Sequence, residues 1–98
     1  MQINISTRHG DLSDPAKQKI RDKVEKLGKF IERVSRIDVT VDLEKPDVPA
    51  VDILVATELK KEFQASYSSE ELYGCIDQII DKIQQQMKRF KEKLTDHR

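Results

Sequence analysis

The chain has 98 residues, a length that predicts one independently folding domain over residues 1–98. Charged side chains make up 37% of it, but 18 basic and 18 acidic residues give a formal net charge of zero, so net charge alone excludes neither a polyanion nor a protein as partner. The single cysteine excludes an internal disulfide, and no apolar run could span a membrane, so we expect a soluble cytoplasmic domain with no membrane partner.

The first third of the chain predicts a strand and then a helix. Residues 2–8 alternate between apolar and polar side chains, which is typical of a half-buried strand. Pro15 follows a serine and an aspartate that can cap a helix, and it suits the first helical position. Apolar residues spaced by three and four then predict a helix over 15–34. Gly28 lies inside it, which indicates either close packing or an early weakening of the helix.

The rest of the chain predicts three strands and a long helix. The strands, recognised by alternation between proline-rich or polar connections, are 36–44, 51–58 and 62–68. Ser68 and Glu71 have the spacing of a capping box. An apolar stripe then continues to about residue 94, which predicts the second helix.

This order of elements predicts an α+β fold. The order is strand, helix, three strands, helix, and each strand has one apolar face, so we expect a four-stranded sheet with two helices packed on one face. The connection through the first helix is long enough for a parallel crossover between the first two strands. If the later strands form a meander, the two helices run roughly parallel.

Basic side chains gather on the same flank of both predicted helices. On helical wheels the flank holds Lys19, Lys23, Lys26, Lys29 and Arg33 in the first helix, and Lys82, Arg89 and Lys93, with Gln86 in the same row, in the second. Residues 14–36 hold eight bases and four acids, residues 82–98 six and two, and residues 37–62 three and seven. The neutral total therefore hides a positive helix layer and a negative sheet layer.

This pattern leaves three interpretations open. Charge runs on helices are usually solvated faces with ion pairs, such as Asp22–Lys26 or Asp81–Lys88 here. A flank of lysine and arginine suits phosphates rather than base edges, and would hold RNA by its backbone and shape. Such a protein could be a generic binder of double-stranded RNA. Alternatively, the chain is a protein-interaction module that self-associates through a sheet edge or binds a partner by the acidic sheet face.

The residue types that catalysis and metal binding require are scarce. His9 and His97 lie at opposite ends of the chain, and with Cys75 they show no paired ligand spacing. Cys75 lies at the edge of the second apolar stripe, which favours a buried inert thiol over a nucleophile. No glycine-rich phosphate loop, nucleophile elbow or zinc-protease motif occurs. We expect no enzyme activity, no cofactor and no small-molecule substrate.

The chain resembles the ribosome hibernation-promoting factor family, which includes the ribosome-associated translation inhibitors, also called ribosomal subunit interface proteins. The resemblance covers residues 1–97 and rests on "MQINI", "KVEKLGKFIERV" and "LYGCIDQIIDKIQQQMKRFKEKL". Its strongest motif, Tyr-x-x-Ile-Asp-x-x-(apolar)-Asp-Lys, runs from Tyr73 to Lys82. The resemblance implies a fold like a double-stranded-RNA-binding domain. It also implies binding to the small ribosomal subunit, with its 16S-type rRNA, in the mRNA and tRNA channel, and inhibition of translation during stress or stationary phase.

The resemblance also implies which residues contact rRNA. Carried over residue by residue, these are Lys23, Lys26, Arg33, Lys82, Arg89, Lys91 and Lys93, whereas Lys29 is an RNA-binding candidate from the wheel alone. The sequence departs from the family at Gln85, where a basic residue is frequent, and in the loop "TRHGDLS", where we hypothesise that Arg8 compensates. The length predicts a short family member, with a truncated long member and a weak homo-oligomer left open.

Overall fold

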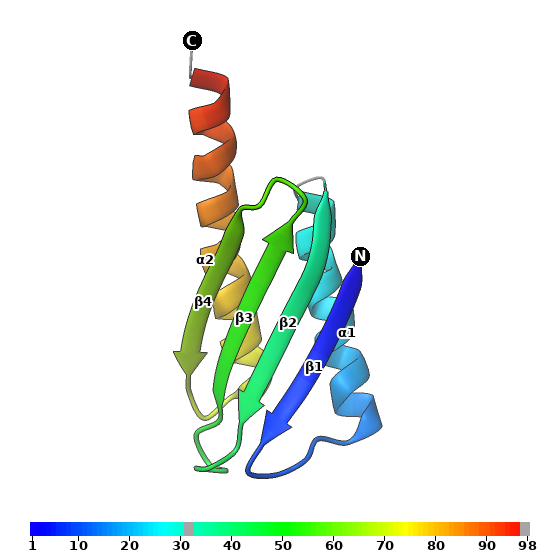
Figure 1. The fold of residues 1–98 in the computed structure, drawn as a ribbon. Coiled ribbons are helices and arrows are strands. Elements are labelled where there is room, and N and C mark those ends of the chain that lie inside the picture. Colours follow the sequence, from blue (N-terminus) through cyan, green and yellow to red (C-terminus); the bar gives the residue numbers. More distant parts are fainter. Residues whose placement is uncertain (31–32, 97–98) are drawn as a thin grey trace.

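The computed structural model describes residues 1–30 and 33–96. Six elements follow one another in the order that the sequence predicts (Figure 1). Their bounds are β1 Gln2–Arg8, α1 Asp14–Phe30, β2 Val34–Asp42, β3 Ala50–Thr57, β4 Glu62–Ser68 and α2 Leu72–Asp96. The expected α+β class and the number and order of the elements are therefore confirmed.

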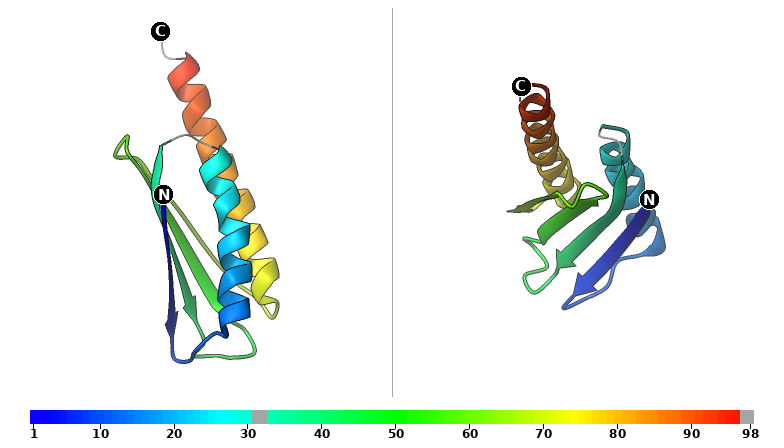
Figure 2. Two further views of the ribbon diagram at one scale, coloured as in Figure 1. Left: turned by 90° about the vertical axis from the view of Figure 1, so that its right-hand side faces the viewer. Right: turned by 45° about the horizontal axis from the view of Figure 1, so that its top comes forward.

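The four strands form one mixed sheet in the order β1-β2-β3-β4. β1 and β2 are parallel, joined by the crossover through α1, whereas β2, β3 and β4 form an antiparallel meander. Both helices cover the same face of the sheet and run in the same direction, as the meander requires (Figures 1 and 2). The other face is uncovered, and the end of α2 extends beyond the sheet (Figure 1).

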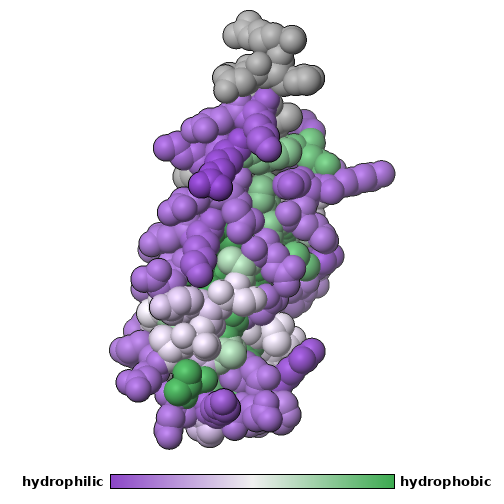
Figure 3. All heavy atoms as spheres, turned by 90° about the vertical axis from the view of Figure 1, so that its left-hand side faces the viewer, coloured by the Kyte–Doolittle hydropathy of each residue, from purple (hydrophilic) through white to green (hydrophobic). Residues whose placement is uncertain are grey.

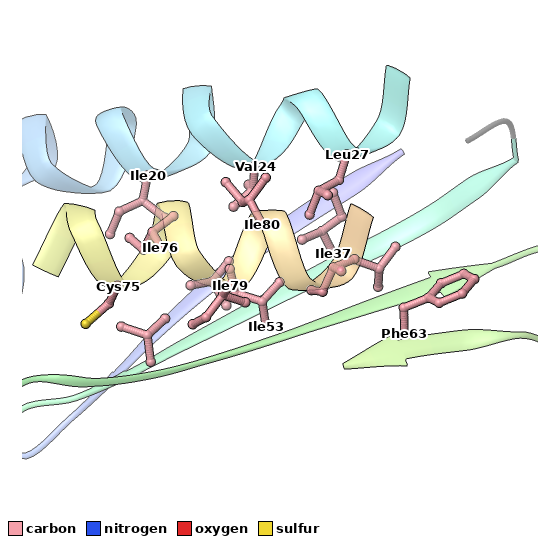
Figure 4. Packing of buried hydrophobic residues seen from close by; sticks show 14 of the residues in the cluster. Ile20, Val24, Leu27, Ile37, Ile53, Phe63, Cys75, Ile76, Ile79 and Ile80 are labelled. Carbon is pink, nitrogen blue, oxygen red and sulfur yellow. The ribbon is translucent and has the colours of Figure 1, made fainter. Parts of the chain in front are cut away.

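An aliphatic core lies between the helices and the sheet. Figure 4 shows Ile20, Val24 and Leu27 of α1 against Ile76 and Ile80 of α2, over the sheet. All five side chains are buried, and each contributes roughly 1.5–3 kcal/mol by leaving water. Because the apolar stripe of each helix is held against the sheet, the core also fixes where the polar flanks of the helices point.

No helix in the described part of the chain is long and apolar enough to cross a membrane.

The first helix ends earlier than its apolar spacing predicts. α1 ends at Phe30, and Val34 already pairs in β2, so the predicted helix over 15–34 is wrong at its end. Arg33 lies in the turn between them with a φ of 67°. Val34 is extended because it pairs with Thr57 of β3. Glu58 N–H donates a 2.9 Å hydrogen bond to the Arg33 carbonyl, which ties this turn to the β3–β4 connection.

Gly28 is a close-packing position rather than a point where the helix weakens. α1 continues through it to Phe30. A Cβ atom at Gly28 would contact Sδ of Met1, whose side chain lies over the helix at this point. The N-terminal residue therefore uses the space that the glycine leaves.

The second helix begins with a different cap from the predicted one. Ser68 is the last residue of β4, and Ser69 supplies the capping hydroxyl instead. Its Oγ accepts a hydrogen bond from Glu71 N–H at 3.2 Å, and the Glu71 carbonyl accepts the first helical bond from Cys75 N–H at 2.9 Å. The predicted Ser68–Glu71 capping box is therefore wrong by one residue.

Candidate nucleic-acid interface

The basic flank of α1 faces α2. Both helices run in the same direction with their apolar stripes toward the sheet, so the same flank of each points toward the β4 side. Because α2 lies on the β4 side of α1, this flank of α1 faces α2. Lys23 Nζ lies 2.9 Å from Oδ1 and 3.2 Å from Oδ2 of Asp77, and Lys19 Nζ lies 4.1 Å from the ring centroid of Tyr73. This flank therefore lines the seam between the helices.

The corresponding flank of α2 lies over the edge of the sheet at β4. Lys82 Nζ is 4.8 Å from the ring centroid of Tyr67, a cation–π contact. Gln86 Nε2 donates a 3.0 Å hydrogen bond to the Gln64 carbonyl. Arg89 continues the row with an exposed side chain. Figure 3 looks onto this side of the molecule, where hydrophilic side chains cover most of the surface and apolar surface appears as a band and in smaller patches.

The helix layer therefore carries two basic stripes. We call the first the seam stripe, with Lys19, Lys23 and Lys26, and the second the edge stripe, with Lys82, Arg89 and Lys93. The outward ridge of α2, which includes Asp81 and Gln85, lies between them, because these residues point away from the buried stripe.

The other predicted site residues lie apart from these stripes. Lys29 is exposed on the outward side of α1. Arg33 is exposed but lies in the turn after α1, so the expectation that it lies on the helix flank is wrong. Lys91 is exposed on α2, about 200° around the helix from Lys93, on the flank that faces α1.

The simplest alternative is that acidic residues of the same helix neutralise the basic flank. The two ion pairs that the sequence suggests for this, Asp22–Lys26 and Asp81–Lys88, do not form. Asp22 accepts a 2.8 Å hydrogen bond from Gln18 Nε2 instead of pairing with Lys26. Among the described residues the ion pairs are His9–Asp42, Lys23–Asp77 and Arg36–Asp38. None of these three pairs involves Lys82, Arg89 or Lys93 of the edge stripe.

The uncovered face of the sheet is acidic. Strand alternation places on it Asp38, Asp42, Asp52 and Glu62, together with Arg8 and Arg36. Burial opposes ionisation of Asp38, but hydrogen bonds from Asn4 and Arg36 outweigh it and lower the pKa of this carboxyl. Asp38 therefore stays charged at neutral pH. The positive helix layer and the negative sheet layer lie on opposite sides of the core.

A histidine is attached to this acidic face. His9 Nδ1 lies 2.9 Å from Asp42 Oδ1, and this hydrogen bond raises the pKa of His9 and lowers that of Asp42. With Glu44 they bring three metal-ligating atoms within 4.8 Å of one another. The same Asp42 oxygen also accepts the Glu44 N–H at 2.9 Å, so hydrogen bonds within the group account for its geometry. Cys75, the other candidate ligand, is buried in the core with its sulfur 3.0 Å from Ser69 Oγ.

Helical wheels do not identify one basic residue that lies near the edge stripe. Lys61 comes from the β3–β4 connection, yet it borders a cleft with Arg89 and Lys93 of α2. Helical wheels cannot place a hairpin residue against a helix. The signal in the sequence was the adjacent pair Lys60 and Lys61 in a turn directly before a strand that the second helix must cover.

Comparisons with known proteins agree on one family. The model of the family described as "Sigma 54 modulation protein / S30EA ribosomal protein" matches residues 3–95. "Ribosome hibernation promoting factor" of Salmonella typhimurium is 29% identical over 97 residues, covering 99% of this chain and 100% of that protein. The protein of the same name from Escherichia coli K12 is 27% identical over 97 residues, with the same coverage of both.

Two solved structures share the fold. The N-terminal domain of Thermus thermophilus Protein Y matches with a TM-score of 0.79 at 21% identity, covering 92% of this chain and 99% of that one. A ribosomal subunit interface protein from Coxiella burnetii matches with a TM-score of 0.79 at 19% identity, covering 94% and 99%. At this level of identity the likeness shows the fold, which agrees with the arrangement of strands and helices described above.

Proposed function

The chain belongs to the Sigma 54 modulation protein / S30EA ribosomal protein family, and we propose that it is a ribosome hibernation factor. In this proposal residues 1–98 form a single ribosome-binding domain. It occupies the mRNA and tRNA channel of the small subunit, contacts 16S-type rRNA, and inhibits translation in the cytoplasm during stress or stationary phase. The family is non-enzymatic, which agrees with the scarcity of catalytic residue types in the sequence.

The observation that carries the proposal is the pair of basic stripes on a preformed helix layer. The edge stripe makes no ion pair with the described side chains of residues 1–29 and 33–93, so toward these its cations can meet phosphates without first losing a carboxylate partner. RNA carries a closely spaced row of phosphates, and neutralising them releases bound counterions. Because the core already holds both helices in place, little ordering is required of the protein on binding.

The mechanism in this proposal is occlusion. Side chains of the edge stripe and the seam stripe hold the RNA backbone, which positions the protein without reading bases. The acidic sheet layer then faces away from the bound RNA, and its negative charge disfavours a second RNA strand there. A domain bound in this way fills space that mRNA or tRNA would occupy.

A purified translation system tests this function. The wild-type protein should lower synthesis of a reporter in proportion to the fraction of small subunits that it binds, and chemical probing should show protection of rRNA in the decoding channel. Inhibition without protection there would contradict the proposed place of binding. The rival interpretation, a module that binds a protein partner by its acidic sheet face, predicts neither inhibition nor protection.

A further inference from the structure

The β3–β4 turn and the C-terminal half of α2 enclose a cleft of about 220 Å³ at the edge of the helix layer. Its lining residues are Lys61, Phe63, Gln86, Arg89, Phe90 and Lys93. Three of these six side chains are cationic, two are aromatic, and none is acidic. Neither the wheels nor the family resemblance assigns a role to the cleft.

The aromatic residues form its floor. Phe63 of β4 and Phe90 of α2 pack edge to face, with ring centroids 5.7 Å apart and an interplanar angle of 74°. Phe63 is buried at 2% exposure, whereas Phe90 is only half-buried. Part of the Phe90 ring is therefore available to a planar ligand group.

The cationic residues form the rim. Lys61 Nζ lies 5.7 Å from the centroids of both rings, and Arg89 and Lys93 reach the cleft from successive turns of α2. None of these three makes an ion pair with a side chain of residues 1–29 or 33–93. The rim is therefore a concentrated positive field over a small apolar floor.

Backbone hydrogen bonds hold Lys61 in this position. The buried Thr57 donates to the Lys61 carbonyl through its N–H at 3.1 Å and through its hydroxyl at 2.8 Å. Lys60 adopts the left-handed backbone conformation of the turn, with a φ of 60°, so the connection closes without a glycine. Across the cleft, the hydrogen bond from Gln86 to the Gln64 carbonyl holds α2 against β4.

We propose that this cleft binds one unpaired nucleotide of a single-stranded RNA segment. The phosphate lies among Lys61, Arg89 and Lys93, and the base lies against Phe90. A basic groove combined with an exposed aromatic ring is how proteins hold single-stranded nucleic acid. The cleft is too small for an A-form duplex, and an unpaired base is the form in which RNA offers a ring face. The inference rests on the proposed function, because it extends the edge stripe to a specific kind of RNA strand.

Titration with a uridine hexanucleotide tests the inference directly. We expect the ring resonances of Phe90 to shift in NMR spectra with the hexanucleotide and not with inorganic phosphate. Lys61→Gln should weaken hexanucleotide binding by about fivefold or more, since it removes one of the three cations proposed to hold the phosphate. Lys60→Gln is the matched control, because it makes the same change of charge at the next position outside the cleft and should weaken binding less than about twofold.

Several results would overturn the inference. An equal loss of hexanucleotide affinity in Lys61→Gln and Lys60→Gln would show that binding is diffuse charge attraction. Phe90 resonances that do not shift would show that no base enters the cleft. Equal affinity for a short RNA duplex would contradict an unpaired nucleotide. Sedimentation of the same proteins with small ribosomal subunits separates this inference from the proposed function. If the wild type sediments with subunits while the hexanucleotide leaves Phe90 unmoved, only the cleft assignment fails.

Discussion

Lys23 of α1 and Asp77 of α2 form an ion pair across the seam between the helices, with Nζ 2.9 Å from Oδ1. The lysine side chain is 22% exposed and the aspartate 58%. The pair has two consequences. It ties the two helices together, and it places a carboxylate within a stripe whose proposed ligand is a polyanion. In the proposed complex, Lys23 would therefore meet RNA as a neutralised pair rather than as an independent cation.

Removing this carboxylate should strengthen RNA binding. Asp77→Asn keeps the size of the side chain and releases Lys23, so we expect subunit affinity to rise by about fivefold, equivalent to roughly 1 kcal/mol. The free energy of unfolding should fall by no more than about 1 kcal/mol, because the pair is partly solvated. Binding by filter retention and unfolding in urea measure the two effects. Weaker binding by Asp77→Asn would show that the aspartate positions Lys23 for RNA.

Charge reversal in the edge stripe should weaken binding without unfolding the protein. We expect Lys82→Glu and Arg89→Glu each to lower subunit affinity at least about tenfold and to reduce the salt dependence of binding. Both side chains are exposed, so the free energy of unfolding should change by about 0.5–1 kcal/mol at most, including the contact of Lys82 with Tyr67. Lys45→Glu, in the β2–β3 connection, is the control for net charge. Normal binding by either folded stripe variant would remove the edge stripe from the site.

Gly28→Ala should stabilise the protein. Alanine is favoured over glycine inside a helix by roughly 0.5–1 kcal/mol. The new methyl group would contact Met1 Sδ, the far part of a flexible side chain that is 60% exposed and can move away. We therefore expect a higher midpoint of thermal unfolding, by a few degrees for about 1 kcal/mol. A lower midpoint would show that the packing of Met1 on α1 contributes more than the helix propensity of alanine.

The His9–Asp42 pair should make stability depend on pH. The pKa of His9 is raised above 6.5, so its contribution is fully present below that pH and is lost as pH rises through the folded value. The pKa of Asp42 is lowered below 3.8, so its contribution is present above that pH and is lost as pH falls through the folded value. The pair therefore stabilises most between these limits.

A variant at His9 isolates this effect. His9→Asn removes the titrating ring and suits the φ of 58° at this position. The difference in unfolding midpoint between wild type and His9→Asn should be largest near pH 5 and shrink toward about pH 9. A difference that stays constant across this range would mean that the contact is not an ion pair in solution.

The spacing of apolar residues predicted most of the fold, because the side chains that form the core recur with the period of each helix or strand. The apolar stripes around Ile20 and Ile79 and the alternation of β2 and β3 each identified the buried face correctly. The end of α1 could not be predicted, because apolar spacing continues past Phe30 and only strand pairing decides where extended backbone begins. For the basic flanks, the helical wheels predicted only the direction in which the side chains point around each helix axis.

What those flanks meet depends on contacts between elements distant in sequence. No wheel shows that Lys23 faces Asp77, because that needs the position of α1 along α2. Likewise, Lys61 lines the same cleft as Arg89 only because β4 pairs with β3 and packs beneath α2. The candidate site was therefore predictable as a set of charges, but its division into two stripes and a cleft was not.

The most direct test of the proposed function is sedimentation of the purified protein with small ribosomal subunits at two salt concentrations, with and without mRNA and initiator tRNA. If about six side chains contact phosphates, affinity should fall about a thousandfold between roughly 50 and 200 mM salt. The mRNA and tRNA should displace the protein if it occupies their channel. Binding that is insensitive to salt and unaffected by these ligands would contradict the proposal, and would leave the basic stripes as solvated helix faces.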